Sequence, residues 1–258
     1  NVTIATGKTA VVYLDGAGSG AAVVDAMALV DPGVTDTLAE VLSAGNSSGG
    51  TDISMTAGDD IVTASAGTNN LRLGAGAGAA IASGGNYNTV VGDSAGAAIT
   101  TGDNNTALGY QALLSTTTGG SNTALGLQAL KSNTTGDTNV AVGRVALEDA
   151  TTATGNVAMG YGAARNTTTG ASNVALGYLA LDANTTGGQN TAVGFEAADA
   201  NTVGTMNVAI GYQALTTDTK GSKSVAVGKQ ALQVQNFTSA TDAFNTAVGH
   251  NAGASVTT

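Results

Sequence analysis

The stretch Asn105-Thr-Ala-Leu-Gly-Tyr-Gln-Ala112 decides the fold, because the chain repeats it at a constant interval. Successive copies up to the ninth start 17 residues apart, as Asn88 and Asn105 do. The tenth copy starts 21 residues after the ninth. We expect the four extra residues, around 233–243, to loop out without shifting the register. A degenerate copy starts at Asn70. The ten copies begin at Asn88, Asn105, Asn122, Asn139, Asn156, Asn173, Asn190, Asn207, Ser224 and Asn245.

Such regularity requires every unit to meet the same environment, which a solenoid provides because each coil touches only its two neighbours. Numbering positions from the Asn of each unit, positions 2 and 4 are β-branched or aliphatic and alternate with small residues, which indicates a strand. Gly at position 5, invariant in all ten copies, permits a corner. We therefore predict an all-β, parallel β-solenoid (β-roll) over residues 70–258 with one unit per coil, about 4.8 Å apart.

The alternation also predicts which side chains point inward. The aliphatic residue at position 4 suggests that positions 2 and 4 face the core and that position 3 faces outward. Position 3 is Ala in nine copies, and an outward position kept so small suggests close approach of another chain. The alternative is that Ala merely suits a tight coil. The candidate trimer interface is Ala107, Ala124, Ala141, Ala158, Ala175, Ala192, Ala209, Ala226 and Ala247.

Two further positions predict ladders along the solenoid axis, and a third varies. Asn at position 1 should stack as an amide ladder, and Thr at position 13 as a strand ladder. Position 6 differs from copy to copy and should lie at the outer surface or at the rim of an interface. Four consecutive copies place aromatic residues there, which could fasten the coils or chains together or contact a receptor. They are Tyr161, Tyr178, Phe195 and Tyr212.

Composition argues against most chemical functions. The chain contains no Cys and one His, His250, so we expect no thiolate or triad site. Neither the Asp59-Asp60 pair nor the glycine-rich stretch 74–78 has the context of a metal or phosphate site, and we expect no catalytic residue and no cofactor. A net charge of −10 disfavours nucleic acid as a partner. No apolar run is long enough for insertion into a membrane.

The repeat resembles the short units in the heads of trimeric autotransporter adhesins of the YadA-like type. Asn105-Thr-Ala-Leu-Gly-Tyr-Gln-Ala112 carries the likeness, which covers about 70–258. That resemblance implies a parallel β-roll with three chains packed side by side, and hence a homotrimer. The units of those heads usually have a shorter period, so the extra residues here should lengthen the Thr-Thr-Gly corner.

The segment 1–69 lacks the period. Val2–Ile4 and Ala10–Leu14 read as strands, a capping-box pattern predicts a short helix over 37–44, and strands at Ile53–Met55 and Ile61–Thr63 lead into the solenoid. We expect 1–69 to be an attachment and trimer-organising segment. Its stretches Val11–Gly16, Thr37–Gly45 and Gly49–Ile53 are similar to segments of bacteriophage tail fibres.

Together these features favour a structural and adhesive fibre segment of a phage tail fibre rather than an enzyme. Its expected partners are itself, other virion tail proteins and a host cell-surface receptor such as a glycan, with the virion as its location. One alternative is the head of a bacterial trimeric autotransporter adhesin at the cell surface. Another is a monomeric ice- or carbohydrate-binding solenoid, although the Thr-x-Thr spacing of a flat ice-binding face is not repeated.

Overall fold

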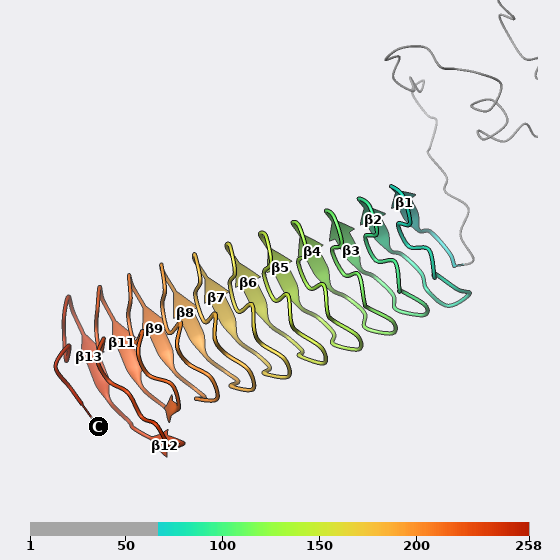
Figure 1. The fold of residues 1–258 in the computed structure, drawn as a ribbon. Helices are drawn as coiled ribbons and strands as arrows, with labels where there is room; N and C mark the ends of the chain where they lie inside the picture. The colour runs from blue at the N-terminus through green and yellow to red at the C-terminus, as the bar shows by residue number, and fades with distance from the viewer. Residues whose placement is uncertain (1–66, 258) are drawn as a thin grey trace, which may run out of the picture. The chain divides into compact units, whose positions relative to one another are not determined.

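The computed structural model describes residues 67–257, and they form a parallel β-solenoid with one repeat unit per coil (Figure 1). Eleven short strands lie side by side in one parallel sheet along the solenoid, and two more form a small second sheet. The strands are β1 (Leu71–Leu73), β2 (Thr89–Val91), β3 (Thr106–Leu108), β4 (Thr123–Leu125), β5 (Val140–Val142), β6 (Val157–Met159), β7 (Val174–Leu176), β8 (Thr191–Val193), β9 (Val208–Ile210), β10 (Gly221–Ser222), β11 (Val225–Val227), β12 (Thr241–Asp242) and β13 (Thr246–Val248).

The predicted fold class is confirmed, because equivalent residues of successive units pair directly. Thr106 pairs with Thr123, its equivalent in the next unit, and Val174 pairs with Thr191 in the same way. Residues 67–257 contain no helix, and therefore none that could span a membrane. The strands and the helix predicted within residues 1–66 lie outside the described residues, as does the Asp59-Asp60 pair.

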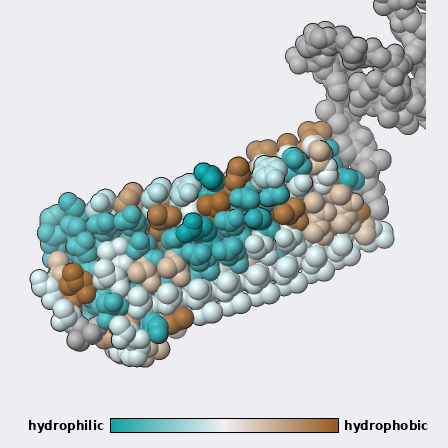
Figure 2. Space-filling view, in the orientation of Figure 1, coloured by the Kyte–Doolittle hydropathy of each residue, from teal (hydrophilic) through white to brown (hydrophobic). Residues whose placement is uncertain are grey.

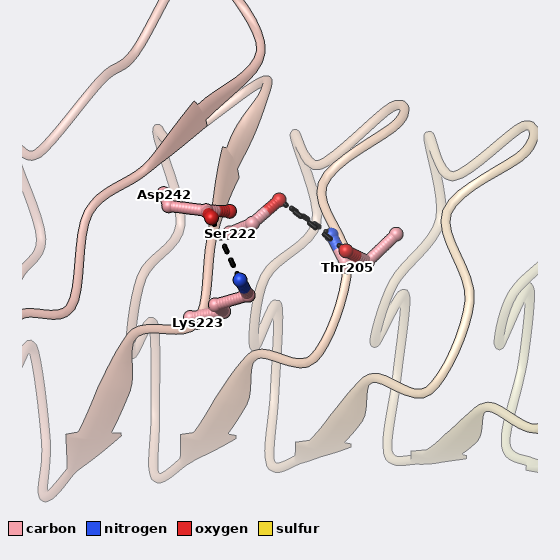
Figure 3. Close-up of polar contacts among 4 residues, drawn as sticks. All are labelled: Thr205, Ser222, Lys223 and Asp242. Atoms are coloured by element: carbon pink, nitrogen blue, oxygen red, sulfur yellow. Dashed lines mark hydrogen bonds and ion pairs between the residues drawn. The ribbon is translucent and has the colours of Figure 1, made fainter.

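The register survives the irregular steps at both ends of the repeat. The degenerate copy joins the sheet through β1, whose Leu71 pairs with Thr89. Beyond the long step, Val225 of β11 pairs with Thr246 of β13. The extra residues lie at a corner, where 238–240 are exposed, and the chain then pairs again through β10 and β12. Figure 3 shows polar contacts that hold this corner against the neighbouring coils.

The polar contacts at that corner connect three successive coils. The Lys223 Nζ lies 2.6 Å from the Asp242 Oδ2, and the Ser222 Oγ accepts a 3.0 Å hydrogen bond from the Thr205 amide (Figure 3). Lys223 also lies over the ring of Phe244, 5.1 Å from its centroid. These contacts hold the lengthened coil against its neighbours, so the insertion changes the corner and leaves the sheet in register.

The prediction of which strand side chains face inward is wrong. Position 3 is the buried one, and the nine alanines proposed as an outward interface are fully or almost fully buried within their own chain. Positions 2 and 4 are half-buried or exposed, as the burial pattern of β7 shows. The nine alanines therefore form core and not surface: Ala107, Ala124, Ala141, Ala158, Ala175, Ala192, Ala209, Ala226 and Ala247.

The reason is the narrow cross-section of the coil. In most coils position 3 meets Ala at position 8 and one large aliphatic residue at position 9, as in Leu113, and these fill the interior. In the two N-terminal coils position 9 is Gly instead, and an isoleucine at position 12 takes the space, as in Gly96 and Ile99. A coil with Leu at position 9 thus has no space for a second long side chain, and a large residue at position 3 would exceed its interior.

The Asn ladder is confirmed, and it supports the interior of the coils from Asn88 to Asn207. In Asn156 the Nδ2 donates to the Gly170 carbonyl at 2.9 Å, and the Oδ1 accepts a 2.8 Å bond from the Asn173 amide. The ladder residues from Asn88 to Asn207 are buried, so their amides satisfy backbone groups that water cannot reach. Thr at position 13 also forms a ladder, but its residues lie in bends and not in the predicted strands. The Thr168 Oγ1, for example, donates to the Thr185 carbonyl at 3.1 Å.

Gly at position 5 is required by two separate constraints. Gly109 has a φ of 136°, which disfavours residues with a side chain. A Cβ there would lie 2.6 Å from the carbonyl oxygen of Gly126 in the next coil. The invariance of this position therefore reflects the close stacking of the coils as well as the predicted corner.

Candidate functional site: the outer sheet face and the aromatic ladder

The outer face of the eleven-stranded sheet carries no charge over ten coils. We call it the outer face, and it consists of the side chains at positions 2 and 4 of the copies from Asn88 onward, all of them Thr, Val, Leu, Met or Ile. Several are well exposed, with Leu108 at 49%, Met159 at 45% and Ile210 at 38%. Sequence reasoning assigned these residues to the core and therefore missed this surface. The sequence carried no signal that these positions are exposed, because uncharged, mostly aliphatic positions are typical of a core.

The four aromatic residues predicted to lie in register form a continuous stack along the solenoid axis. The ring centroids of Tyr161 and Tyr178 are 5.3 Å apart, those of Tyr178 and Phe195 are 5.1 Å apart, and those of Phe195 and Tyr212 are 5.2 Å apart. The ring planes differ by 8° to 12°. The rings are between 38% and 45% exposed, so the predicted surface position of this aromatic ladder holds.

A cation closes each end of the aromatic ladder. The Arg144 guanidinium lies 5.6 Å from the centroid of Tyr161, and the Lys229 ammonium lies 5.8 Å from that of Tyr212. Both cations occupy position 6 of the neighbouring coils, and ring faces attract them through the aromatic quadrupole. The faces are thus covered by other rings or by cations, and the exposed parts are the ring edges.

This arrangement matters for the two interpretations of the aromatic ladder. A sugar ring stacks on an open aromatic face, and the ladder has its inner faces occupied by neighbouring rings. Fastening of successive coils is therefore one role that the geometry directly supports, since stacked pairs contribute beyond their buried area. Any contact with a receptor would use ring edges and the hydroxyl groups of Tyr161, Tyr178 and Tyr212.

A row of charged side chains at position 10 includes two carboxyls with perturbed pKa values. The Arg165 Nη2 lies 3.0 Å from the Asp182 Oδ2, and the Thr216 Oγ1 donates a 2.8 Å bond to the Asp199 Oδ1. Burial raises the pKa of Asp199, and the negative charges of Glu196 and Asp182 add to that shift. Burial also raises the pKa of Asp182, against the opposing effect of Arg165.

We expect Asp199→Asn to raise the thermal stability of the solenoid at neutral pH. A carboxyl whose pKa is higher in the folded than in the unfolded state destabilises the fold once it ionises, so stability falls as pH rises through that window. An amide keeps an oxygen for the Thr216 hydroxyl and removes the repulsion from Glu196. The gain should disappear in acid, where Asp199 is neutral in both states. Melting curves of both proteins across this pH range measure it.

Asp93→Asn is the matched control, because Asp93 is exposed and lies on a distant coil at position 6. It removes one negative charge from the chain without touching the position 10 row. A gain of equal size in both variants would show that net charge, and not the buried carboxyl, is responsible.

The remaining candidate groups do not come together into a chemical site. His250 is exposed on the last coil. Within residues 67–257 no three His, Cys, Asp or Glu side chains are placed so that they could hold a metal ion.

Comparisons with known proteins identify no relative. No family model matches the chain, no curated protein matches it, and no solved structure matches it.

Proposed function

We propose that this chain is a structural and adhesive fibre segment, most simply of a phage tail fibre, that assembles as an elongated homotrimer and contacts the host surface. The observation that supports it is the uncharged outer face, which runs parallel to the solenoid axis. Ten rungs at about 4.8 Å give this face a length of about 48 Å. Soluble monomers rarely expose contiguous apolar patches beyond a few hundred Å².

A second copy of the chain is the occupant that fits this face best. A flat row of Thr, Val and Leu repeated at the coil spacing is complementary to the same row on another chain, so copies can pack side by side with their axes parallel. Closed rotational symmetry then buries the face completely without leaving a free edge. The likeness to trimeric adhesin heads favours three chains. The interface residues differ from those first expected, since positions 2 and 4 replace position 3.

The adhesive role rests on the position that varies from coil to coil. Position 6 carries the aromatic ladder and its cationic ends at the outer surface. Residues there can differ from coil to coil without disturbing the stacking of the coils. A host receptor such as a glycan and the other tail proteins of the virion are the partners we propose. The head of a bacterial adhesin, displayed at the cell surface, remains the alternative for the same architecture.

One observation favours the monomeric ice- or carbohydrate-binding alternative. Position 14 presents an exposed Thr in six consecutive coils, from Thr101 to Thr186. Figure 2 shows a strip of near-neutral hydropathy running along the lower edge of the solenoid. Because such a protein would work as a monomer, the mass of the folded particle distinguishes it from both fibre interpretations.

Charge placed on the outer face should dissociate the trimer without unfolding its chains. Met159 and Ile210 are exposed in the single chain, so a glutamate at either position stays solvated there and becomes unpaired only when another chain covers it. We expect Met159→Glu with Ile210→Glu to reduce the mass seen by light scattering from three chains to one chain of 24.7 kDa. The circular dichroism spectrum should keep its β signature.

Thr169→Glu is the control, because it adds a charge at the exposed position 14 on the same solenoid. It should leave the mass at three chains. A monomeric mass for the folded wild-type chain at micromolar concentration would contradict the proposal. Binding of the labelled wild-type particle to candidate host cells, measured alongside the dissociated variant, tests the adhesive part.

A further inference from the structure

We propose that Tyr161 and Tyr178 form a site for oxidative cross-linking into dityrosine within one chain. Their ring centroids are 5.3 Å apart and their planes differ by 12°. Both rings are partly exposed, at 38% and 45%. Two phenols are thus held side by side on adjacent coils, where a small oxidant can reach them.

The aromatic ladder makes this pair unique among residues 67–257. Of its three stacked pairs, only Tyr161–Tyr178 joins two phenols, because Phe195 separates Tyr178 from Tyr212. Arg144 covers the other face of Tyr161, and Lys229 lies over Tyr212. A radical formed on Tyr161 or Tyr178 therefore has one phenol as its stacked neighbour.

The reaction requires a one-electron oxidant such as a peroxidase using hydrogen peroxide. Each phenol loses one electron and one proton to become a tyrosyl radical, and the two radicals join through the ring carbons next to their oxygens. Loss of a hydrogen from each joined carbon to its oxygen restores the aromatic rings. The two electrons and two protons reduce one hydrogen peroxide to two waters, so the protein loses two hydrogens in total.

The consequence would be a covalent staple between neighbouring coils. Solenoid stability depends on contacts between adjacent repeats, and separation of one coil from the next is the step by which such a structure opens. A bond between equivalent positions of two successive units limits the freedom of the unfolded chain and opposes that step. Oxidised protein should therefore melt at a higher temperature than untreated protein.

The experiment treats the full chain, at low concentration, with peroxidase and hydrogen peroxide. We expect blue dityrosine fluorescence, an intact mass lower by two hydrogens, and a cross-linked peptide that joins Tyr161 to Tyr178. Tyr178→Phe should lose most of this fluorescence, whereas Tyr212→Phe should retain it. Phe195 already occupies the aromatic ladder, so neither substitution should disturb the fold.

Equal fluorescence in the Tyr178→Phe variant, or a link between chains in place of one within a chain, would overturn the proposal. Because both rings belong to one chain, the expected product does not depend on the trimer. A monomeric wild-type protein that still forms the Tyr161–Tyr178 link would thus contradict the proposed assembly and leave the cross-linking site intact.

Discussion

Replacing Ala175 with glutamate should unfold the solenoid and not merely separate one chain from another. Ala175 is fully buried within its own chain, between Ala158 and Ala192 of the adjacent strands. A carboxylate there would lie in the narrow apolar core without a partner. An unpaired buried charge costs several kcal/mol, and the larger side chain adds strain to an interior that is already filled. Typical domains are stable by only about 5–15 kcal/mol.

Urea titration followed by circular dichroism measures this effect, with Met159→Glu as the matched control. Met159 belongs to the neighbouring strand and points outward, with 45% of its surface exposed. The same charge should therefore cost little within a single chain at that position. A folded, monomeric Ala175→Glu protein would contradict the assignment of position 3 to the core.

Period and register could be predicted from the sequence because repetition reports them directly. The constant step between copies gives the strand pairing, and the Asn and Thr positions give the two ladders, all of which the structure contains. The register after the insertion also follows, since the motif resumes unchanged at Asn245. None of these features depends on knowing which way a side chain points.

The direction of the side chains could not be predicted, because size was taken as the guide to burial. Large aliphatic residues are usually buried, but Ala is often buried too, and in a narrow core the small residue takes the inward position. In the coil that begins at Asn122, the interior between positions 3, 8 and 9 has room for two alanines and one leucine. Ala124, Ala129 and Leu130 are therefore buried. Position 4 then faces outward, and Leu125 on the same strand is only half-buried.

The aromatic ladder was predicted in position but not in geometry. Identical spacing places Tyr161 and Tyr178 in register, and the sequence leaves open whether their faces are free. The coil spacing decides this, because rings on adjacent coils are held about 5 Å apart and cover one another. The cationic ends follow from Arg144 and Lys229 at the same position, a pattern that could have been noticed in the sequence.

The ninth copy shows how the solenoid tolerates a missing Asn. It begins with Ser224, whose short side chain cannot span the coil, and the buried Gln235 at position 12 brings an amide into the same coil. The Gln235 Nε2 donates to the Ser224 Oγ at 3.0 Å and to the Asp218 Oδ2 at 2.7 Å. Its Oε1 accepts a 2.7 Å bond from the Asn245 Nδ2. An amide from a different position of the same unit thus bonds the side chains of Ser224, Asp218 and Asn245.

Asn156→Ser should therefore destabilise the solenoid strongly, and adding Thr167→Gln should recover part of the loss. The single change leaves the Gly170 carbonyl and the Asn173 amide without their side-chain partner in the core. Each buried group left unsatisfied costs about 1–3 kcal/mol, so for two groups we expect a loss of about 2–6 kcal/mol in the free energy of unfolding. Thr167 occupies position 12 of that coil, as Gln235 does in the ninth.

A double-mutant cycle in urea separates the rescue from a general effect of glutamine. Thr167→Gln alone should be neutral or destabilising, since the Asn156 amide already satisfies the groups that the new side chain could reach. A favourable coupling between the two substitutions would show that positions 1 and 12 act as one amide-supplying unit per coil. If the coupling is zero, the pairing of Ser224 with Gln235 is a local feature of the lengthened corner. A glutamine at position 12 then cannot replace the Asn at position 1 in an ordinary coil.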